Sequence, residues 1–301
     1  MASSINSKAY AASSPRKVAF LGLGVMGLPM AGHLATAGHH VTVYNRNTKK
    51  TQAWVAEFGG RACATPREAA SGAEIVFSCV GNDDDLRSVV LGENGAFAGM
   101  QAGATYVDHT TASASVAREL YAIAKQKSVR FIDAPVSGGQ AGAVNGMLTV
   151  MCGGDAAEFA AVRDVIATMA RAVTLVGPVG AGQLAKMVNQ ICIAGVVQGL
   201  AEGVAFGEAA GLDMKQVLDV ISKGAAQSWQ MENRGSTMVD DKFDFGFAVD
   251  WMRKDLNLAM DEARRNGARL PVTALVDQFY ADVQKMGGNR WDTSSLLKRL
   301  R

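Results

Sequence analysis

The sequence predicts an α/β protein in which an N-terminal Rossmann-type, doubly wound parallel sheet precedes an all-helical C-terminal domain. In the first half, short runs rich in β-branched residues alternate with helix-length segments of spaced apolar residues, such as residues 116–127 and 156–169. Strands that alternate with helices in this way are typical of parallel sheets. The expected strands are residues 18–21, 41–44, 75–80, 105–107, 129–132, 148–151 and 173–176.

The pattern changes after Gly180. Residues 183–210 contain no proline and no obvious turn, and apolar side chains occur nearly all round the predicted helix, so we expect this helix to be buried. Polar residues such as Lys186 and Glu202 interrupt the segment and argue against a membrane span. Further helices follow, with breaks near Gly211, Gly267 and Pro271.

We therefore predict a dinucleotide-binding domain at residues 17–180 and a helical domain for substrate binding and oligomerisation at residues 181–301. Residues 1–16 are rich in serine and alanine, contain no acid and lack the apolar core of a secretory signal. A flexible, frayed tail is the favoured interpretation of this segment. A short organelle-targeting segment is the alternative.

The composition excludes several classes of protein. Of the 301 residues, 49% are hydrophobic and 19% are charged, which supports a sizeable core and argues against global disorder. The formal net charge of +2 argues against a dedicated binder of nucleic acid or of membrane surfaces. The four cysteines are scattered and the chain has only four histidines, so we expect reduced thiols, no metal site and a cytoplasmic location.

A glycine motif follows the first predicted strand. The motif is GxGxxG, and it leads into the helix expected at residues 28–37. Gly22 allows a tight turn, Gly24 lets the backbone approach a pyrophosphate, and Gly27 lets helix and strand pack closely. The helix N-terminus then offers N–H groups and a positive dipole end to phosphates. The predicted phosphate-binding residues are Gly22, Leu23, Gly24, Val25, Met26 and Gly27.

The end of the second predicted strand indicates which dinucleotide binds. An NAD site places an acid there to hydrogen-bond the ribose 2′-hydroxyl, whereas this chain has Asn45, Arg46 and Asn47 after Tyr44. Arg46 can pair with a 2′-phosphate, which a carboxylate would repel. The sequence thus favours NADP (NADPH). The alternative is that Arg46 is a solvated loop residue and that NAD binds as well.

Three further motifs occur in order along the chain. Residues 131–139 read FIDAPVSGG, residues 180–190 read GAGQLAKMVNQ, and residues 254–256 read KDL. Together with the glycine motif and the stretch at residues 287–295, they closely resemble the β-hydroxyacid dehydrogenases. That family includes 3-hydroxyisobutyrate dehydrogenase, tartronate semialdehyde reductase and glyoxylate/succinic semialdehyde reductases, and the resemblance covers about residues 17–298.

The resemblance implies that Lys186 and Asn189 are catalytic, with Lys186 as general acid/base. Interconversion of an alcohol and a carbonyl needs a hydride carrier and a proton-transfer group near the carbonyl oxygen. Asn189 and Gln190 share the helix face of Lys186 and could orient the lysine or hydrogen-bond the substrate. The family often has Asn where this chain has Gln190, so the role of Gln190 stays open. The alternative for Lys186 is a lysine that only caps the domain junction.

A second group of residues resembles the family's substrate site. Ser137, Gly138 and Gly139 look like a cradle for the substrate carboxylate, since a hydroxyl and exposed N–H groups can hold an anion. A glycine-rich turn that binds nothing is the alternative. Thr111 matches a family position near both the nicotinamide and the substrate.

The remaining predicted contacts are to the cofactor. Val80 ends the strand expected at residues 75–80, and Gly81 and Asn82 follow it; these residues should border the cofactor ribose, because ligands bind at the carboxyl ends of parallel strands. Lys254 resembles the family lysine that reaches back to the cofactor.

The resulting hypothesis is an NADP-preferring oxidoreductase that transfers a hydride between the nicotinamide and a short β-hydroxy acid or its semialdehyde. The first alternative is a reductase of imines or larger carbonyls, and the second is a non-catalytic NADP-binding scaffold. Relatives of both kinds typically replace the lysine, so Lys186 argues against them. We expect a small carboxylate substrate and a homodimer or homotetramer, since the apolar helix at residues 183–210 needs more cover than the helical half easily supplies.

Overall fold

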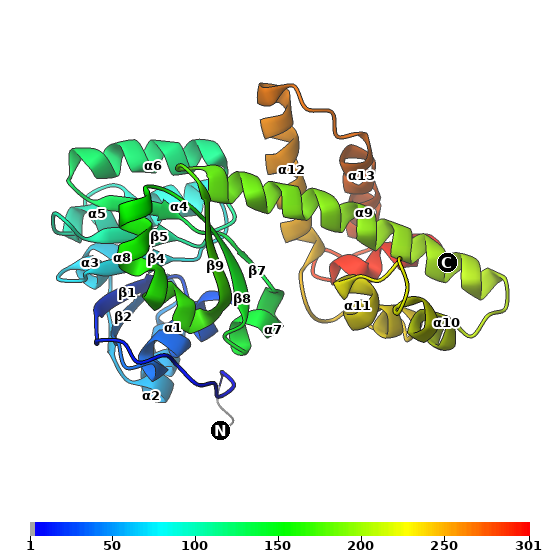
Figure 1. Ribbon diagram of the computed structural model, residues 1–301, viewed down its shortest axis with the longest axis horizontal. Helices are drawn as coiled ribbons and strands as arrows, with labels where there is room; N and C mark the ends of the chain where they lie inside the picture. Colours follow the sequence, from blue (N-terminus) through cyan, green and yellow to red (C-terminus); the bar gives the residue numbers. More distant parts are fainter. Residues whose placement is uncertain (1–3) are drawn as a thin grey trace. The chain divides into compact units, whose positions relative to one another are not determined.

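The computed structural model describes residues 4–301, which divide into two compact units (Figure 1). The first unit ends at Lys186 and the second runs from Met187 to Arg301. The division falls within one long helix, a few residues after the predicted junction near residue 180.

The first unit is built on a sheet with strand order β3-β2-β1-β4-β5-β6-β8-β7, to which β9 adds by pairing with β8. All neighbouring pairs from β3 to β6 are parallel, whereas β8 is antiparallel to β6 and β7. The order 3-2-1-4-5-6 is that of the Rossmann fold, so the predicted fold class is confirmed. The strands are β1 (Lys17–Leu21), β2 (His40–Tyr44), β3 (Arg61–Ala62), β4 (Ile75–Ser78), β5 (Thr105–Asp108), β6 (Arg130–Asp133), β7 (Val136–Ser137), β8 (Leu148–Gly153) and β9 (Ala170–Gly177).

Helices cover both faces of this sheet, because successive strand residues point to opposite sides. Val18 and Phe20 join a core with one group of helices, whereas Ala19 and Leu21 join a second core with another. Figure 1 shows α2 and α6 on opposite sides of the strands. The first group is α1 (Gly27–Thr36), α2 (Thr48–Phe58), α7 (Gly139–Val144), α8 (Ala156–Ile166) and the 3-10 turn η1 (Ala167–Met169); the second is α3 (Pro66–Ala70), α4 (Asp83–Val90), α5 (Ala96–Gly99) and α6 (Ala114–Gln126).

The second unit is helical, as predicted, and the long helix α9 (Ala181–Ala209) provides one wall of its core. The expectation that α9 is buried all round is wrong. One side, including Val197 and Val204, is buried, but Val196 and Phe206 are 41% and 75% exposed. By length and composition α9 could cross a membrane, and residues on its buried side belong to the core of the second unit. The other helices are α10 (Met214–Ile221), α11 (Trp229–Val239), α12 (Val249–Asn266), α13 (Pro271–Lys285) and the 3-10 helix η2 (Thr293–Arg299).

The N-terminal segment differs from its prediction as a frayed tail. Residues 1–3 lie outside the described residues, but several of residues 4–16 make contacts with the rest of the first unit. The N–H of Asn6 donates to the carbonyl oxygen of Val144 over 2.9 Å. The hydroxyl of Tyr10 lies 2.7 Å from Nδ1 of His33, which is buried in α1. The segment therefore bridges α1 and α7, and contacts so distant in sequence leave no local pattern.

Candidate active site

The glycine motif forms the turn between β1 and α1. Gly22 has a φ of +98°, and a Cβ there would lie 2.4 Å from the carbonyl oxygen of Cys79. A Cβ on Gly27 would lie 1.9 Å from the carbonyl oxygen of Gly22, whereas one on Gly24 would meet no described atom within 4 Å. Backbone atoms thus leave no room for a side chain at Gly22 and Gly27. At Gly24, the position expected to face a pyrophosphate, the space beside the backbone is open.

The N-terminus of α1 is also suited to an anion. Among the described residues, no side chain hydrogen-bonds to it and its first turn holds no acid. By contrast, Asn47, Asn82 and Ser113 cap the N-termini of α2, α4 and α6. A positive dipole end with no acid in its first turn, next to the open Gly24, suits the phosphates of a dinucleotide.

In the loop after β2, two asparagines bind backbone N–H groups, whereas Arg46 pairs with a carboxylate. The side-chain oxygen of Asn45 accepts a hydrogen bond from the N–H of Leu23 over 2.9 Å, so Asn45 holds the glycine turn in place. Asn47 caps α2 by accepting from the N–H of Lys49. Arg46, the predicted partner of a 2′-phosphate, lies 3.0 Å from Asp85 of α4. Sequence reasoning missed Asp85, because the two residues are far apart along the chain.

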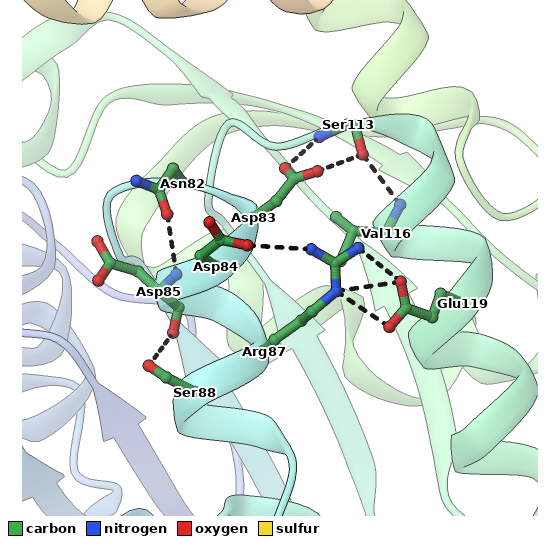
Figure 2. Close-up of polar contacts among 9 residues, drawn as sticks. All are labelled: Asn82, Asp83, Asp84, Asp85, Arg87, Ser88, Ser113, Val116 and Glu119. Atoms are coloured by element: carbon green, nitrogen blue, oxygen red, sulfur yellow. Dashed lines mark hydrogen bonds and ion pairs between the residues drawn. The ribbon is translucent and has the colours of Figure 1, made fainter.

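The loops after β4 and β5 are joined to each other. The N–H of Val80 donates to the hydroxyl of Thr110 over 3.1 Å. Figure 2 shows Asp83, in the first turn of α4, accepting hydrogen bonds from both the N–H and the hydroxyl of Ser113. These contacts hold the predicted cofactor residues Val80, Gly81 and Asn82 beside the loop that carries Thr111, which is half-buried.

Buried polar groups lie at the ends of β4 and β5. The Ser78 hydroxyl donates to the Asp108 carboxylate over 2.7 Å, and burial raises the pKa of Asp108 to about 7. Burial also lowers the pKa of His109 to about 4, so this histidine is neutral at ordinary pH. Its Nδ1 lies 2.6 Å from the carbonyl oxygen of Ala134. His109 thus ties β5 to the segment after β6.

The predicted carboxylate cradle lies where two short elements, β7 and α7, meet, and neither element was predicted from the sequence. Ser137 ends β7 and is half-buried. Gly138 and Gly139 have φ values of +127° and +59°, which other residues adopt only with strain. A Cβ on Gly139 would meet no described atom within 4 Å, so its backbone is open to a ligand.

The start of α9 is anchored by two side chains to which no role was assigned from the sequence. The Asp133 carboxylate accepts from the N–H of Gly180 over 2.7 Å and from that of Gln183 over 3.0 Å. The Gln183 side chain accepts from the N–H of Ala112 over 3.0 Å and donates to the carbonyl oxygen of Thr110 over 2.7 Å. We call Asp133 and Gln183 the helix-start clamp.

The clamp fixes the first turn of α9 beside the loop after β5. A Cβ on Gly182 would lie 2.4 Å from the carbonyl oxygen of Met151, so the turn also packs tightly onto the end of β8. Burial raises the pKa of Asp133 from its ordinary 3.8 to about 6, which leaves it mainly ionised at neutral pH. Lys186 follows Gln183 by about one helical turn and is only 8% exposed.

The second unit brings three predicted residues together around Asp255. The Asn189 side chain donates to the Gln190 oxygen over 2.7 Å, and Gln190 donates to the Asp255 carboxylate over 2.7 Å. The other Asp255 oxygen lies 3.1 Å from Nζ of Lys254. We call Asn189, Gln190, Asp255 and Lys254 the α9–α12 relay. Asp255 is 3% exposed, and a carboxylate within the apolar stripe of α12 is the signal that could have revealed it.

Two surface hollows lie away from these residues. One, of about 370 Å³, is lined by residues that include Lys17, His40 and Arg61, at the amino ends of β1, β2 and β3. The other, of about 260 Å³, includes Glu74, Thr105 and Arg130. Parallel sheets bind ligands at the opposite, carboxyl ends of their strands, so we assign neither hollow to the cofactor.

Known proteins resemble the chain along nearly its whole length. Residues 17–177 match the family model described as the NAD binding domain of 6-phosphogluconate dehydrogenase. Residues 180–300 match the model described as "NAD-binding of NADP-dependent 3-hydroxyisobutyrate dehydrogenase". An uncharacterized oxidoreductase from Shewanella frigidimarina is 68% identical over 94% of this chain and 98% of its own length.

Two further relatives carry more informative names. A probable 3-hydroxyisobutyrate dehydrogenase-like protein of Arabidopsis thaliana, named as mitochondrial, is 39% identical over 100% of this chain and 90% of its own length. The structure of Mycobacterium tuberculosis 3-hydroxyisobutyrate dehydrogenase with L-serine has a TM-score of 0.87 at 30% identity, covering 96% of this chain and 100% of that one. The resemblance seen in the sequence is thereby confirmed: the chain belongs to the 3-hydroxyisobutyrate dehydrogenase family of NAD(P)-dependent hydroxyacid dehydrogenases.

Proposed function

We propose that this enzyme is an NADP-preferring dehydrogenase of a short β-hydroxy acid or its semialdehyde, with Lys186 as general acid/base. The observation that carries the proposal is the burial of Lys186 about one turn after the helix-start clamp. A buried lysine on an anchored helix start can hold a proton at one place, as reduction of a carbonyl requires.

The cofactor would be held by the first unit. The open turn at Gly24 and the uncapped N-terminus of α1 suit the pyrophosphate, and Arg46 suits the 2′-phosphate. When bound, the nicotinamide supplies or accepts the hydride. Lys186 would give its proton to the carbonyl oxygen in reduction and take it back in oxidation, and Asn189 would orient the lysine or the substrate.

The substrate would be held by a cradle of neutral donors. Ser137 offers a hydroxyl, and Gly138 and Gly139 offer backbone N–H groups in a conformation that leaves Gly139 open. Residues 134–142 contain no arginine, which suits one small carboxylate better than a phosphate, for which a bidentate arginine would be expected. The L-serine named with the M. tuberculosis relative is a β-hydroxy acid of this kind.

A panel of small substrates tests the function. Glyoxylate, succinic semialdehyde, tartronate semialdehyde and methylmalonate semialdehyde are each assayed with NADPH and NADH. L-serine and 3-hydroxypropionate are assayed with NADP and NAD. We expect turnover of at least one β-hydroxy acid or semialdehyde, with a higher kcat/KM for the phosphorylated cofactor. Turnover of none of these compounds would contradict the proposal.

The exposed face of α9 supports the proposed homodimer or homotetramer. Val188, Val196 and Phe206 are 60%, 41% and 75% exposed, and added Cβ atoms on Gly199 and Gly203 would meet no described atom within 4 Å. An apolar face with small residues lets a helix of a second copy approach closely. Light scattering should give a mass above that of the monomer, and Phe206→Glu should lower it. A monomeric wild type would contradict this proposal.

A further inference from the structure

The loop that is expected to select the cofactor already holds an ion pair. Nη1 of Arg46, just after β2, lies 3.0 Å from Oδ1 of Asp85, in the first turn of α4. Both residues belong to the first unit. The Arg46 side chain is 75% exposed and that of Asp85 is 23% exposed, so an incoming cofactor can reach the arginine. The group that would bind a 2′-phosphate thus has an anionic partner before any cofactor arrives.

The three acids of this turn have different partners. Asp83 accepts a hydrogen bond from the N–H of Ser113 at the N-terminus of α6, and Asp84 lies 3.4 Å from Arg87. Figure 2 shows the Asp85 carboxylate turned away from Asp84 and Arg87. Of the three acids, Asp85 is the one that pairs with Arg46. Its backbone N–H is capped by Asn82 over 2.8 Å, which fixes the start of the helix that carries it.

NAD and NADP differ in what they would present to this pair. A 2′-phosphate carries about −1.5 to −2 charges at neutral pH, by analogy with other phosphate monoesters. It would compete with Asp85 for Arg46 and would be repelled by the Asp85 carboxylate. A 2′-hydroxyl is neutral, leaves the ion pair intact and can donate a hydrogen bond to a carboxylate.

We propose that Asp85 is a specificity-determining residue that opposes Arg46, so that the enzyme prefers NADP less strongly than Arg46 alone would make it. The inference rests on the proposed function, in which Arg46 pairs with the 2′-phosphate. Because the pair is exposed to solvent, the expected effect is a severalfold change in cofactor preference and not an absolute switch.

The experiment compares Asp85→Asn with the matched control Asp84→Asn. Both variants remove one negative charge from the same helical turn, but Asp84 is 96% exposed and faces Arg87. Dissociation constants for NADP and NAD are measured by titration of the protein without substrate, at low and high salt. We expect Asp85→Asn to bind NADP about three- to tenfold more tightly, with little change for NAD. The gain should shrink at high salt, and Asp84→Asn should change NADP binding by less than about twofold.

Arg46→Ala, alone and combined with Asp85→Asn, separates the possible failures. If Arg46→Ala weakens NADP binding but Asp85→Asn behaves as Asp84→Asn does, this inference is overturned and the proposed function stands. If Arg46→Ala leaves NADP binding unchanged, the phosphate is held elsewhere and both assignments fail. If Asp85→Asn gives its full gain without Arg46, competition for the arginine is overturned.

Discussion

Two polar clusters flank Lys186 along α9, and they are built differently. In the helix-start clamp of the first unit, Asp133 and Gln183 bind backbone N–H and carbonyl groups. In the α9–α12 relay of the second unit, Asn189, Gln190 and Asp255 bind one another through side chains. The first cluster therefore sets where the helix begins, whereas the second sets how individual side chains point. One helix thus has its start fixed by contacts to backbone groups and its polar side chains oriented by contacts to other side chains.

The largest expected effect comes from the residue between the two clusters. Lys186→Ala should lower kcat by about 10²–10⁴-fold while leaving the dissociation constant of the cofactor nearly unchanged, because it removes the proton-transfer group. Lys186→Arg keeps the charge but cannot exchange a proton near neutral pH, so it should not restore turnover. Steady-state kinetics and cofactor titration measure the two quantities. Near wild-type turnover in either variant would show that Lys186 is not the proton-transfer group.

A smaller loss is expected from the clamp. Asn at position 133 has one acceptor oxygen where Asp133 uses two, so Asp133→Asn should displace the first turn of α9 and lower kcat by about 10- to 100-fold. The control is Asp164→Asn, at a site that is 83% exposed. If Asp133→Asn turns over as fast as this control, the clamp does not position the lysine.

The pH dependence of stability tests the same residue independently. Folding raises the pKa of Asp133 from 3.8 to about 6, so the folded state holds this proton more tightly than the unfolded state. The free energy of unfolding of the wild type, relative to Asp133→Asn, should therefore be largest below about pH 4. It should fall as the pH rises to about 6 and then level off. Urea denaturation of both proteins across this range measures the difference, and a difference that rises with pH would contradict the assignment.

The relay should respond less strongly and in a different quantity. Asp255→Asn removes a charged partner from both Gln190 and Lys254, and we expect kcat/KM to fall by roughly tenfold. Asp261→Asn, on the same helix and 56% exposed, is the control. A fall in kcat itself as large as that of Asp133→Asn would remove the proposed distinction between the clusters.

The smallest effect is expected outside both clusters. Ser137→Ala removes one neutral hydroxyl donor from the carboxylate cradle, and kcat/KM for an acid substrate should fall by about two- to tenfold. The methyl ester of the same substrate, which is a poorer acceptor, should be affected less. If kcat/KM falls equally for the acid and the ester, Ser137 does not bind the carboxylate and belongs only to a structural turn.

Elements whose pattern is local could be predicted from the sequence alone. Seven strands were expected near their observed places, because alternating β-branched runs and spaced apolar residues reflect burial within one element. The turn into α1 was equally evident, since Gly22 and Gly27 occupy positions where a Cβ would meet backbone atoms. In contrast, β3, β7 and α7 contain two, two and six residues, too few to show a period.

The contacts between polar side chains from distant parts of the chain could not be predicted from the sequence. Asp133 and Asp255 stand within motifs that were evident in the sequence, but their partners Gly180 and Gln190 lie 47 and 65 residues away along the chain. The sequence likewise predicts Arg46 as a phosphate ligand, but it does not show that Asp85 lies beside it. Local periodicity reports which face of an element is buried. Pairing between distant residues follows from the order of the strands and the packing of the helices, and both depend on interactions throughout the chain.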